Sequence, residues 1–344
     1  MKNMKAWLLV GALTFVMGLS ACASERKVDT VVQTKTEVSE ENQESHYPVT
    51  ITTYNYNQEP VEMTFYQAPE RVLAYANSNI EELLALGLGD RIVAACGLDG
   101  EVREDLKDEF EKINYLDEKP SKEDVVAMEP DFIAAWYSSF SEKWLDDVDF
   151  WQERGVNTYM SMNSACMGPA SEVPREIKWE FQDILNLGKI FDCEEKAQAL
   201  VDEMQGEIDK IQEYVKDKTP LTVAVLENEN DSFRVYGHEV LGGNIAEMVG
   251  AELKIGAENS ENIGAEDLIA ADPDVLFMVN YDGFKTPEEA IADITENPAY
   301  ASLSSVKNGK VFSINLNEIY CSGIHTYDGI LTFAKALYPE LYEE

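Results

Sequence analysis

The sequence predicts an α/β protein in which two Rossmann-like lobes are bridged by a single long helix. Short apolar runs alternate with amphipathic segments over residues 48–344, which is typical of parallel βαβ units. The pattern Glu-Asp, two apolar residues, Ala, any residue, an acid, Pro and Asp stands at 123–131 and again at 266–274. Between the two copies, residues 193–218 form an uninterrupted amphipathic stretch, so the chain reads as one architecture built twice.

Residues 1–21 have the layout of an export signal. Two lysines precede an apolar run, and small residues precede Cys22. Leu19-Ser20-Ala21-Cys22 resembles the bacterial lipobox, so we expect Cys22 to be lipidated and to carry two acyl chains, enough for stable anchoring. An ordinary signal peptide with a chance cysteine is the alternative. Residues 22–47 are polar and lack an apolar period, which predicts a flexible tether.

The N-terminal lobe is predicted over residues 48–192. Alternating residues at 49–56 and 61–67, separated by Gln-Glu-Pro, indicate an opening hairpin. The rest of this lobe alternates apolar runs, expected to be strands, with amphipathic segments, expected to be helices. The strands are expected at 71–76, 91–97, 130–136 and 156–162, and the helices at 79–87, 121–128 and 150–155.

The connecting helix is predicted over 193–218, because its apolar residues recur every three or four positions and form one stripe. About 25 residues at about 1.5 Å each give a rod of roughly 37 Å. The C-terminal lobe, 219–344, resumes the alternation with strands expected at 221–227, 274–279 and 310–316. Each copy of the repeat is expected to be a helix that ends before a proline and leads into a buried strand, although two common junctions could also match by coincidence.

Charge and cysteine content exclude some functions. The chain has 65 Asp and Glu against 27 Lys and Arg, a formal charge of −38, which argues against binding to nucleic acid. No internal apolar run reaches the roughly 18 residues that a membrane span needs. The cysteines after Cys22 show no paired spacing, and they are Cys96, Cys166, Cys193 and Cys321. We therefore expect each to be a small buried apolar side chain, although their disulfide state stays open.

Several segments together resemble the class III substrate-binding proteins of ABC importers for iron–siderophore complexes, haem and cobalamin. They are residues 70–97, the two repeat copies, 310–316 and 322–341, on an exported chain with a lipid tether. The resemblance implies a monomer outside the cytoplasm, held on the cell membrane by lipidated Cys22. Such a protein is not an enzyme. It has no cofactor of its own, although its ligand can carry Fe or Co.

The function implied by the resemblance is capture of an iron complex, a siderophore or haem, between the lobes. The loaded protein then delivers it to a permease driven by a cytoplasmic ATPase. A corrinoid ligand is the alternative within the family, and an exported glycoside-active enzyme or an adhesin is a remote alternative. No GxSxG, HExxH, P-loop or GxGxxG motif in its required context supports an enzyme.

The ligand cleft should be rimmed by loops that leave the carboxyl ends of the parallel strands. These loops are rich in aromatic residues, Met and amides, which suit flat ligands. They contain no Arg or Lys, with Lys143, Arg234 and Lys285 only near, which counts against strongly anionic siderophores. Haem or a corrinoid would need an axial His, Tyr or Met. The small number of histidines argues against a site that binds a bare metal ion directly. The candidate ligand contacts are Tyr75, Asn77, Trp136, Tyr137, Met160, Met162, Tyr236, His238, Tyr281, Tyr320 and His325.

Docking to the permease, in the family that the chain resembles, uses a carboxylate on the outer surface of each lobe. In the N-terminal lobe this role would fall to Glu81 or its neighbour Glu82. In the C-terminal lobe it would fall to Glu247, where the sequence departs from the usual spacing by placing Asn244 at the expected position. Such contacts are suited to bidentate Arg residues of the permease.

Overall fold

The computed structural model describes residues 45–167, 173–258 and 260–343. The predicted export signal, the lipidated Cys22 and nearly all of the tether lie outside the described residues. Residues 45–344 form one compact unit. No helix in the described part of the chain is long and apolar enough to cross a membrane.

The N-terminal lobe is built on a five-stranded parallel sheet with the order β5-β4-β3-β6-β7. The predicted opening hairpin is present as β1 and β2, which pair antiparallel beside it. The strands are β1 (Val49–Tyr54), β2 (Pro60–Phe65), β3 (Val72–Tyr75), β4 (Ile92–Cys96), β5 (Tyr115–Leu116), β6 (Phe132–Ala135) and β7 (Asn157–Met160). The helices are α1 (Asn77–Ala85), α2 (Lys107–Phe110), α3 (Lys122–Ala127), α4 (Val148–Gln152), α5 (Met162–Ala165) and α6 (Ile177–Ile190).

The C-terminal lobe repeats this plan with the parallel order β10-β8-β11-β12, to which β9 adds an antiparallel edge on β8. The strands are β8 (Thr222–Asn228), β9 (Phe233–Val235), β10 (Glu252–Leu253), β11 (Val275–Asn280) and β12 (Val311–Asn315). The helices are α8 (Leu241–Met248), α9 (Ala265–Ala271), α10 (Pro287–Thr295), α11 (Ser304–Lys307) and α12 (Thr326–Leu337). Because β3, β6 and β7 occupy the places of β8, β11 and β12, the predicted two-lobed α/β class is confirmed.

The aspartate of the repeated Pro-Asp pair makes equivalent hydrogen bonds in both lobes. Asp131 precedes β6, and its carboxylate accepts the backbone N–H groups of Glu70 and Arg71 just before β3, both at 2.8 Å. Asp274 precedes β11, and its carboxylate accepts the backbone N–H of Thr222 at the start of β8 at 2.9 Å. Each aspartate therefore fixes the start of the neighbouring parallel strand, which explains why the motif occurs twice.

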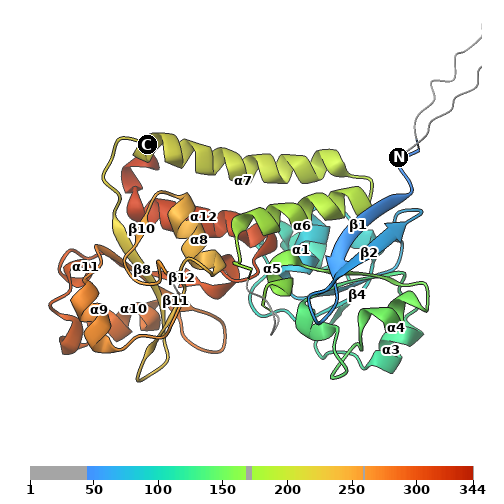
Figure 1. The fold of residues 1–344 in the computed structure, drawn as a ribbon, viewed down its shortest axis with the longest axis horizontal. Helices are drawn as coiled ribbons and strands as arrows, with labels where there is room; N and C mark the ends of the chain where they lie inside the picture. The colour runs from blue at the N-terminus through green and yellow to red at the C-terminus, as the bar shows by residue number, and fades with distance from the viewer. Residues whose placement is uncertain (1–44, 168–172, 259, 344) are drawn as a thin grey trace, which may run out of the picture. The chain divides into compact units, whose positions relative to one another are not determined.

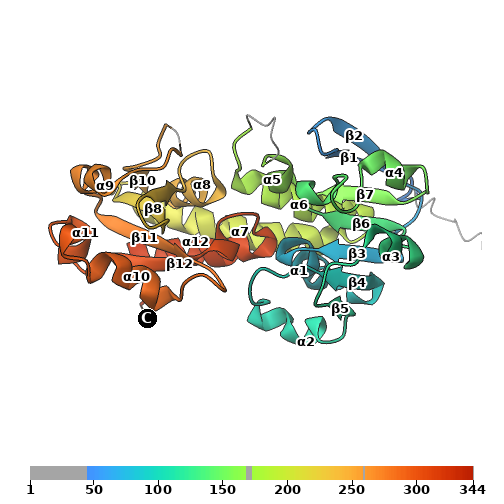
Figure 2. The ribbon, with the colours of Figure 1, turned by 90° about the horizontal axis from the view of Figure 1, so that it is seen from below.

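Helix α7 (Glu194–Val215) lies where the sequence predicts the connecting helix, and it packs against α6 of one lobe and α12 of the other. Its 22 residues span about 33 Å. Figure 1 shows it running along one side of both lobes, and Figure 2 shows the two sheets end to end with α7 behind them. The cysteines at 96, 166, 193 and 321 are free thiols.

Candidate functional site

Two of the cavities between the lobes share Asn317. The smaller one is bounded by Asn77, Asp99 and Trp136 from the N-terminal lobe and by residues 316, 317 and 320–322 from the other lobe. The larger one, of about 570 Å³, also takes residues from both lobes, Glu101 and Val102 on one side and Tyr281, Lys285 and His325 among those on the other. Residues at or just beyond the ends of β3, β6, β11 and β12 line these cavities, as expected for parallel sheets.

In the C-terminal lobe, two tyrosines contact Glu227, and one of them, Tyr281, lines the larger cavity. The carboxylate of Glu227, which is 5% exposed, accepts hydrogen bonds from the hydroxyls of Tyr236 at 2.7 Å and Tyr281 at 3.3 Å. Burial raises the pKa of Tyr236, so this hydroxyl stays protonated and donates. The guanidinium of Arg234 lies 3.8 Å from Glu227 and 5.3 Å from the ring of Tyr236.

Two guanidinium groups lie close to the ring of Tyr320, which lines the smaller cavity. The Cζ atom of Arg175 is 4.8 Å from the ring centre, and that of Arg234 is 5.8 Å away. Atom Nη1 of Arg175 is buried and has no hydrogen-bond partner among the described residues. Sequence analysis missed Arg175, which precedes α6 without any periodic signal. It placed Arg234 only near the cleft, although alternate residues of a strand share a face and Tyr236 stands two positions on.

The N-terminal lobe contributes one aromatic and one amide side chain to the smaller cavity, Trp136 and Asn77. Trp136 donates its indole N–H to the hydroxyl of Ser78 at 3.1 Å. Asn77 accepts the backbone N–H of Asp99 at 2.8 Å through its side-chain oxygen. Tyr137 stacks on Tyr56 with ring centres 5.9 Å apart. Of these side chains, Asn77 and Trp136 line the smaller cavity and are held there in fixed orientations.

Six of the predicted ligand contacts line neither cavity, and they are Tyr75, Tyr137, Met160, Met162, Tyr236 and His238. Tyr75 is 9% exposed and packs against Trp144, and Met160 is fully buried in the core. Met162 is 7% exposed, and its backbone N–H bonds to a buried carboxylate. The Nδ1 atom of His238 lies 2.7 Å from a carboxylate oxygen of Glu247. None of the six borders the two cavities, so these predictions of ligand contact are corrected.

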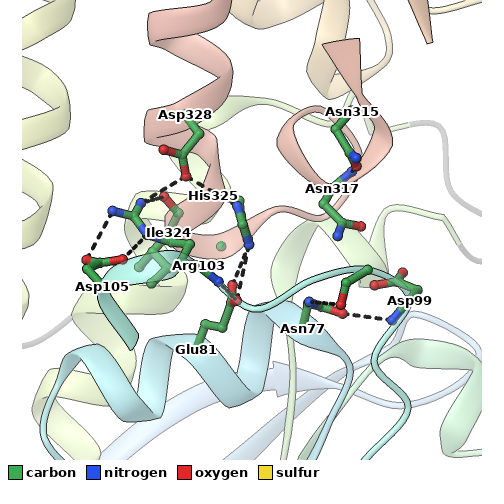
Figure 3. Close-up of polar contacts among 12 residues, drawn as sticks. Asn77, Glu81, Asp99, Arg103, Asp105, Asn315, Asn317, Ile324, His325 and Asp328 are labelled. Atoms are coloured by element: carbon green, nitrogen blue, oxygen red, sulfur yellow. Dashed lines mark hydrogen bonds and ion pairs between the residues drawn. The ribbon is translucent and has the colours of Figure 1, made fainter. Parts of the chain in front are cut away.

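An interlobe network, defined as Glu81, Arg103, His325 and Asp328, joins α1 to the start of α12 (Figure 3). His325 Nε2 lies 2.9 Å from Glu81 Oε2, and His325 Nδ1 lies 3.2 Å from Asp328. Arg103 donates to the same Asp328 carboxylate at 3.1 Å, while its backbone N–H donates to Glu81 at 2.8 Å. The network contains two cations and two carboxylates, and its members come from both lobes.

His325, one of the residues that could have served as an axial ligand, is a cation in this network. Burial lowers its pKa, but the hydrogen bonds to Asp328 and Glu81 outweigh burial and raise the pKa to about 9. Both ring nitrogens are therefore protonated at neutral pH and occupied by carboxylates. A protonated nitrogen has no lone pair to offer to a metal.

The prediction that Glu81 and Glu82 lie on an outer surface is wrong. They are 0% and 1% exposed, because the 3₁₀ turn Gly323–His325 covers this side of α1. Burial, and then the nearby Asp183, Glu180 and Glu81 carboxylates, raise the pKa of Glu82 well above its usual value. The third predicted docking carboxylate, Glu247, is paired with the His238 imidazole. None of the three is a free surface carboxylate.

Residues 72–316 match the family described as periplasmic binding protein. The chain belongs to this family. Together with the relatives below, the match makes it an ABC-transporter substrate-binding protein of the class that serves siderophores, haem and vitamin B12. Members of the family are solute-binding transport proteins and not enzymes.

Three similar proteins illustrate the family. The uncharacterized ABC transporter substrate-binding lipoprotein YvrC of Bacillus subtilis is 24% identical over 99% of both chains. The ferric-anguibactin-binding protein FatB of Vibrio anguillarum is 27% identical over 144 residues, 40% of this chain and 44% of that protein. The crystal structure of a periplasmic binding protein from Veillonella parvula has a TM-score of 0.78 at 32% identity, covering 86% of this chain and 93% of that one.

Proposed function

We propose that this protein captures an anionic ferric siderophore between its lobes, on the outer side of the cell membrane, and passes it to an ABC permease. The observation that carries the proposal is the pair of guanidinium groups, of Arg175 and Arg234, beside the Tyr320 ring. A buried guanidinium nitrogen without a partner is costly, and an anionic ligand would satisfy it.

The arginine pair reverses an expectation drawn from the sequence. The loops that end the strands lack Arg and Lys, which counted against strongly anionic siderophores. Arg175 reaches Tyr320 from the segment before α6, and Arg234 reaches it from β9. Ferric complexes with catecholate or carboxylate donors carry negative charge and planar donor groups, which suit two cations around an aromatic ring.

The surroundings of the histidines also favour an iron complex that brings its own full set of donor atoms over haem, which needs an axial ligand from the protein. His325 is held by two carboxylates, and His238 does not line the cavities, so neither supplies an axial bond. FatB, the relative from Vibrio anguillarum, is named for binding ferric anguibactin. A corrinoid that brings its own axial ligand stays the second candidate.

Fluorescence titration tests the ligand class, because Trp136 lines the smaller cavity and reports on its occupancy. The mature chain would be titrated with a ferric catecholate, a ferric hydroxamate, haemin and cobalamin. We expect saturable quenching, with the ferric catecholate bound most tightly. Loss of one charge-assisted contact costs about 1.5–3 kcal/mol, so Arg175→Gln and Arg234→Gln should each weaken it by roughly 10-fold or more.

Lys143→Gln is the matched control. The substitution removes the same charge as the arginine variants, and Lys143 is exposed and lines neither cavity. Its affinity should equal that of the unmodified chain. If the arginine variants bind the ferric catecholate as tightly as the control, the anionic ligand is rejected. If cobalamin alone saturates, the corrinoid alternative replaces the siderophore.

For permease contact we propose Glu123 and Glu266 in place of the buried Glu81 and Glu82. These two glutamates occupy equivalent positions in the repeat, in the first turns of α3 and α9. Both are exposed, and neither carboxylate has a hydrogen bond or ion pair among the described residues. An exposed apolar residue stands three positions later in each helix, Val126 at 40% and Ile269 at 37% exposure.

The two lobes therefore present the same small surface, one carboxylate beside one aliphatic side chain on the same helical face. A partner with two similar subunits, each offering an Arg next to an apolar patch, would fit such a pair of surfaces. In Figure 1, α3 and α9 lie in different lobes, away from the side along which α7 runs.

A further inference from the structure

His46, Asp192 and Glu194 converge where the described chain begins. His46 stands just before β1, Asp192 follows α6, and Glu194 is the first residue of α7. Their ligand-type atoms all lie within 4.8 Å of one another. His46 Nδ1 is 3.4 Å from Asp192 Oδ1 and 3.3 Å from Glu194 Oε1. Sequence analysis found no metal site, because His46 is far from the two acids along the chain.

The other nitrogen of His46 fixes the state of its ring. Nε2 lies 2.7 Å from the backbone carbonyl of Lys189, which can only accept, so Nε2 carries the proton. In the neutral ring, Nδ1 then presents a lone pair to two carboxylate oxygens. A metal ion placed between these three acceptors would satisfy all of them. A histidine whose second nitrogen bonds to a backbone carbonyl is the usual arrangement around protein-bound metals.

The distances in this cluster match those between ligands of one metal ion. The other histidines in the described residues lie 2.7 Å (His238 with Glu247), 2.9 Å (His325 with Glu81) and 3.2 Å (His325 with Asp328) from carboxylate oxygens. His46 Nδ1 is instead almost equally far from two carboxylates, at 3.3 and 3.4 Å. Ligands that are bound to one tetrahedral zinc at about 2.0–2.2 Å are separated by about 3.3–3.5 Å.

We propose that His46, Asp192 and Glu194 bind a zinc ion, with water in the fourth position. The side chains of Asp192 and Glu194 are 59% and 46% exposed, which leaves the remaining side open to solvent. The ion would connect the residue at the base of the predicted tether to the start of α7. This site is separate from the cavities between the lobes and does not depend on the proposed ligand.

Calorimetric titration of the untagged mature chain with Zn²⁺ tests the site. We expect one equivalent to bind tightly and the melting temperature to rise with zinc concentration, because the ion binds only the folded state. His46→Ala should abolish this binding and the rise. Glu194→Gln removes a solvent-facing ligand without disturbing the histidine and should weaken binding at least 10-fold.

His238→Ala is the matched control, since His238 is also an exposed histidine beside a carboxylate. It should retain the full zinc equivalent, and each variant should melt without zinc close to the unmodified chain. The proposal is overturned if the unmodified chain binds no tight equivalent, or if His46→Ala retains it. Loss of the equivalent in His238→Ala would also overturn it, because the ion would then lie elsewhere.

Discussion

At the scale of single residues, two titratable groups, His325 and Glu180, lie at the contact between the two lobes. His325 is a buried cation between carboxylates, and Glu180 is a buried acid that accepts the backbone N–H of Gly323 in the same turn. Burial raises the pKa of Glu180 to about 7, against hydrogen bonds from Asn163 and Gly323 that lower it. Both groups bind their proton more tightly in the folded chain than in the unfolded one.

We therefore expect the free energy of unfolding to fall as the pH rises. The contribution of Glu180 is present below about pH 4.5 and is lost by about pH 7. The contribution of His325 is present below about pH 6.5 and is lost as the pH passes about 9. Each shift corresponds to something on the order of 3 kcal/mol. Urea unfolding at pH 5, 7 and 9 measures the slope.

Two variants separate the contributions. Glu180→Gln should flatten the decline between pH 4.5 and 7 and leave the alkaline limb intact. His325→Gln should flatten the decline between pH 6.5 and 9. An unmodified chain whose stability is constant or rises from pH 7 to 9 would refute the assignment of His325 as a buried cation.

At the scale of elements, close packing of α6 on α7 sets the position of the connecting helix. Gly188 of α6 allows this approach, because a Cβ atom built there would lie 2.5 Å from the Cβ of Ala197. Gly206, on α7 itself, has open space at the same position. The two glycines are therefore a matched pair that differs only in what surrounds them.

Gly188→Ala should destabilise the protein by about 1–3 kcal/mol, because the new methyl group forces the helices apart. Gly206→Ala should stabilise it by up to about 1 kcal/mol, because alanine is the better helix former and nothing is displaced. Thermal or urea unfolding of both variants measures the difference. Equal effects of the two substitutions would show that α6 and α7 do not pack as described.

The elements themselves were predictable, but which faces of them are buried was not. Alternation, the repeat and the apolar stripe of 193–218 predicted the two sheets and α7, because these signals are local. The apolar period of α1 predicted a helix, but it did not predict that Glu81 and Glu82 are buried. The residues that cover them, 323–325, lie far along the chain. The position of Arg175 beside Tyr320 and the proximity of His46 to Asp192 both result from contacts between distant segments. No local sequence pattern indicates such contacts.

At the scale of the whole molecule, the duplicated α/β plan determines where the cavities lie. Two copies of one α/β plan place the loops at the carboxyl ends of their strands around shared cavities, while α7 joins the lobes. The same duplication places Glu123 and Glu266 on equivalent exposed helices. Ligand capture and permease docking are thus assigned to separate surfaces.

Uptake by cells that carry Glu123→Ala together with Glu266→Ala tests this division most directly. The measurement is transport of the ferric complex that the titration selects, in iron-limited cells, alongside its affinity for the purified variant. Glu195→Ala with Glu203→Ala, two exposed glutamates on α7, is the control of equal charge. We predict unchanged affinity in both proteins, and loss of uptake only in the first. Uptake at the control level in the Glu123 and Glu266 variant would contradict the account.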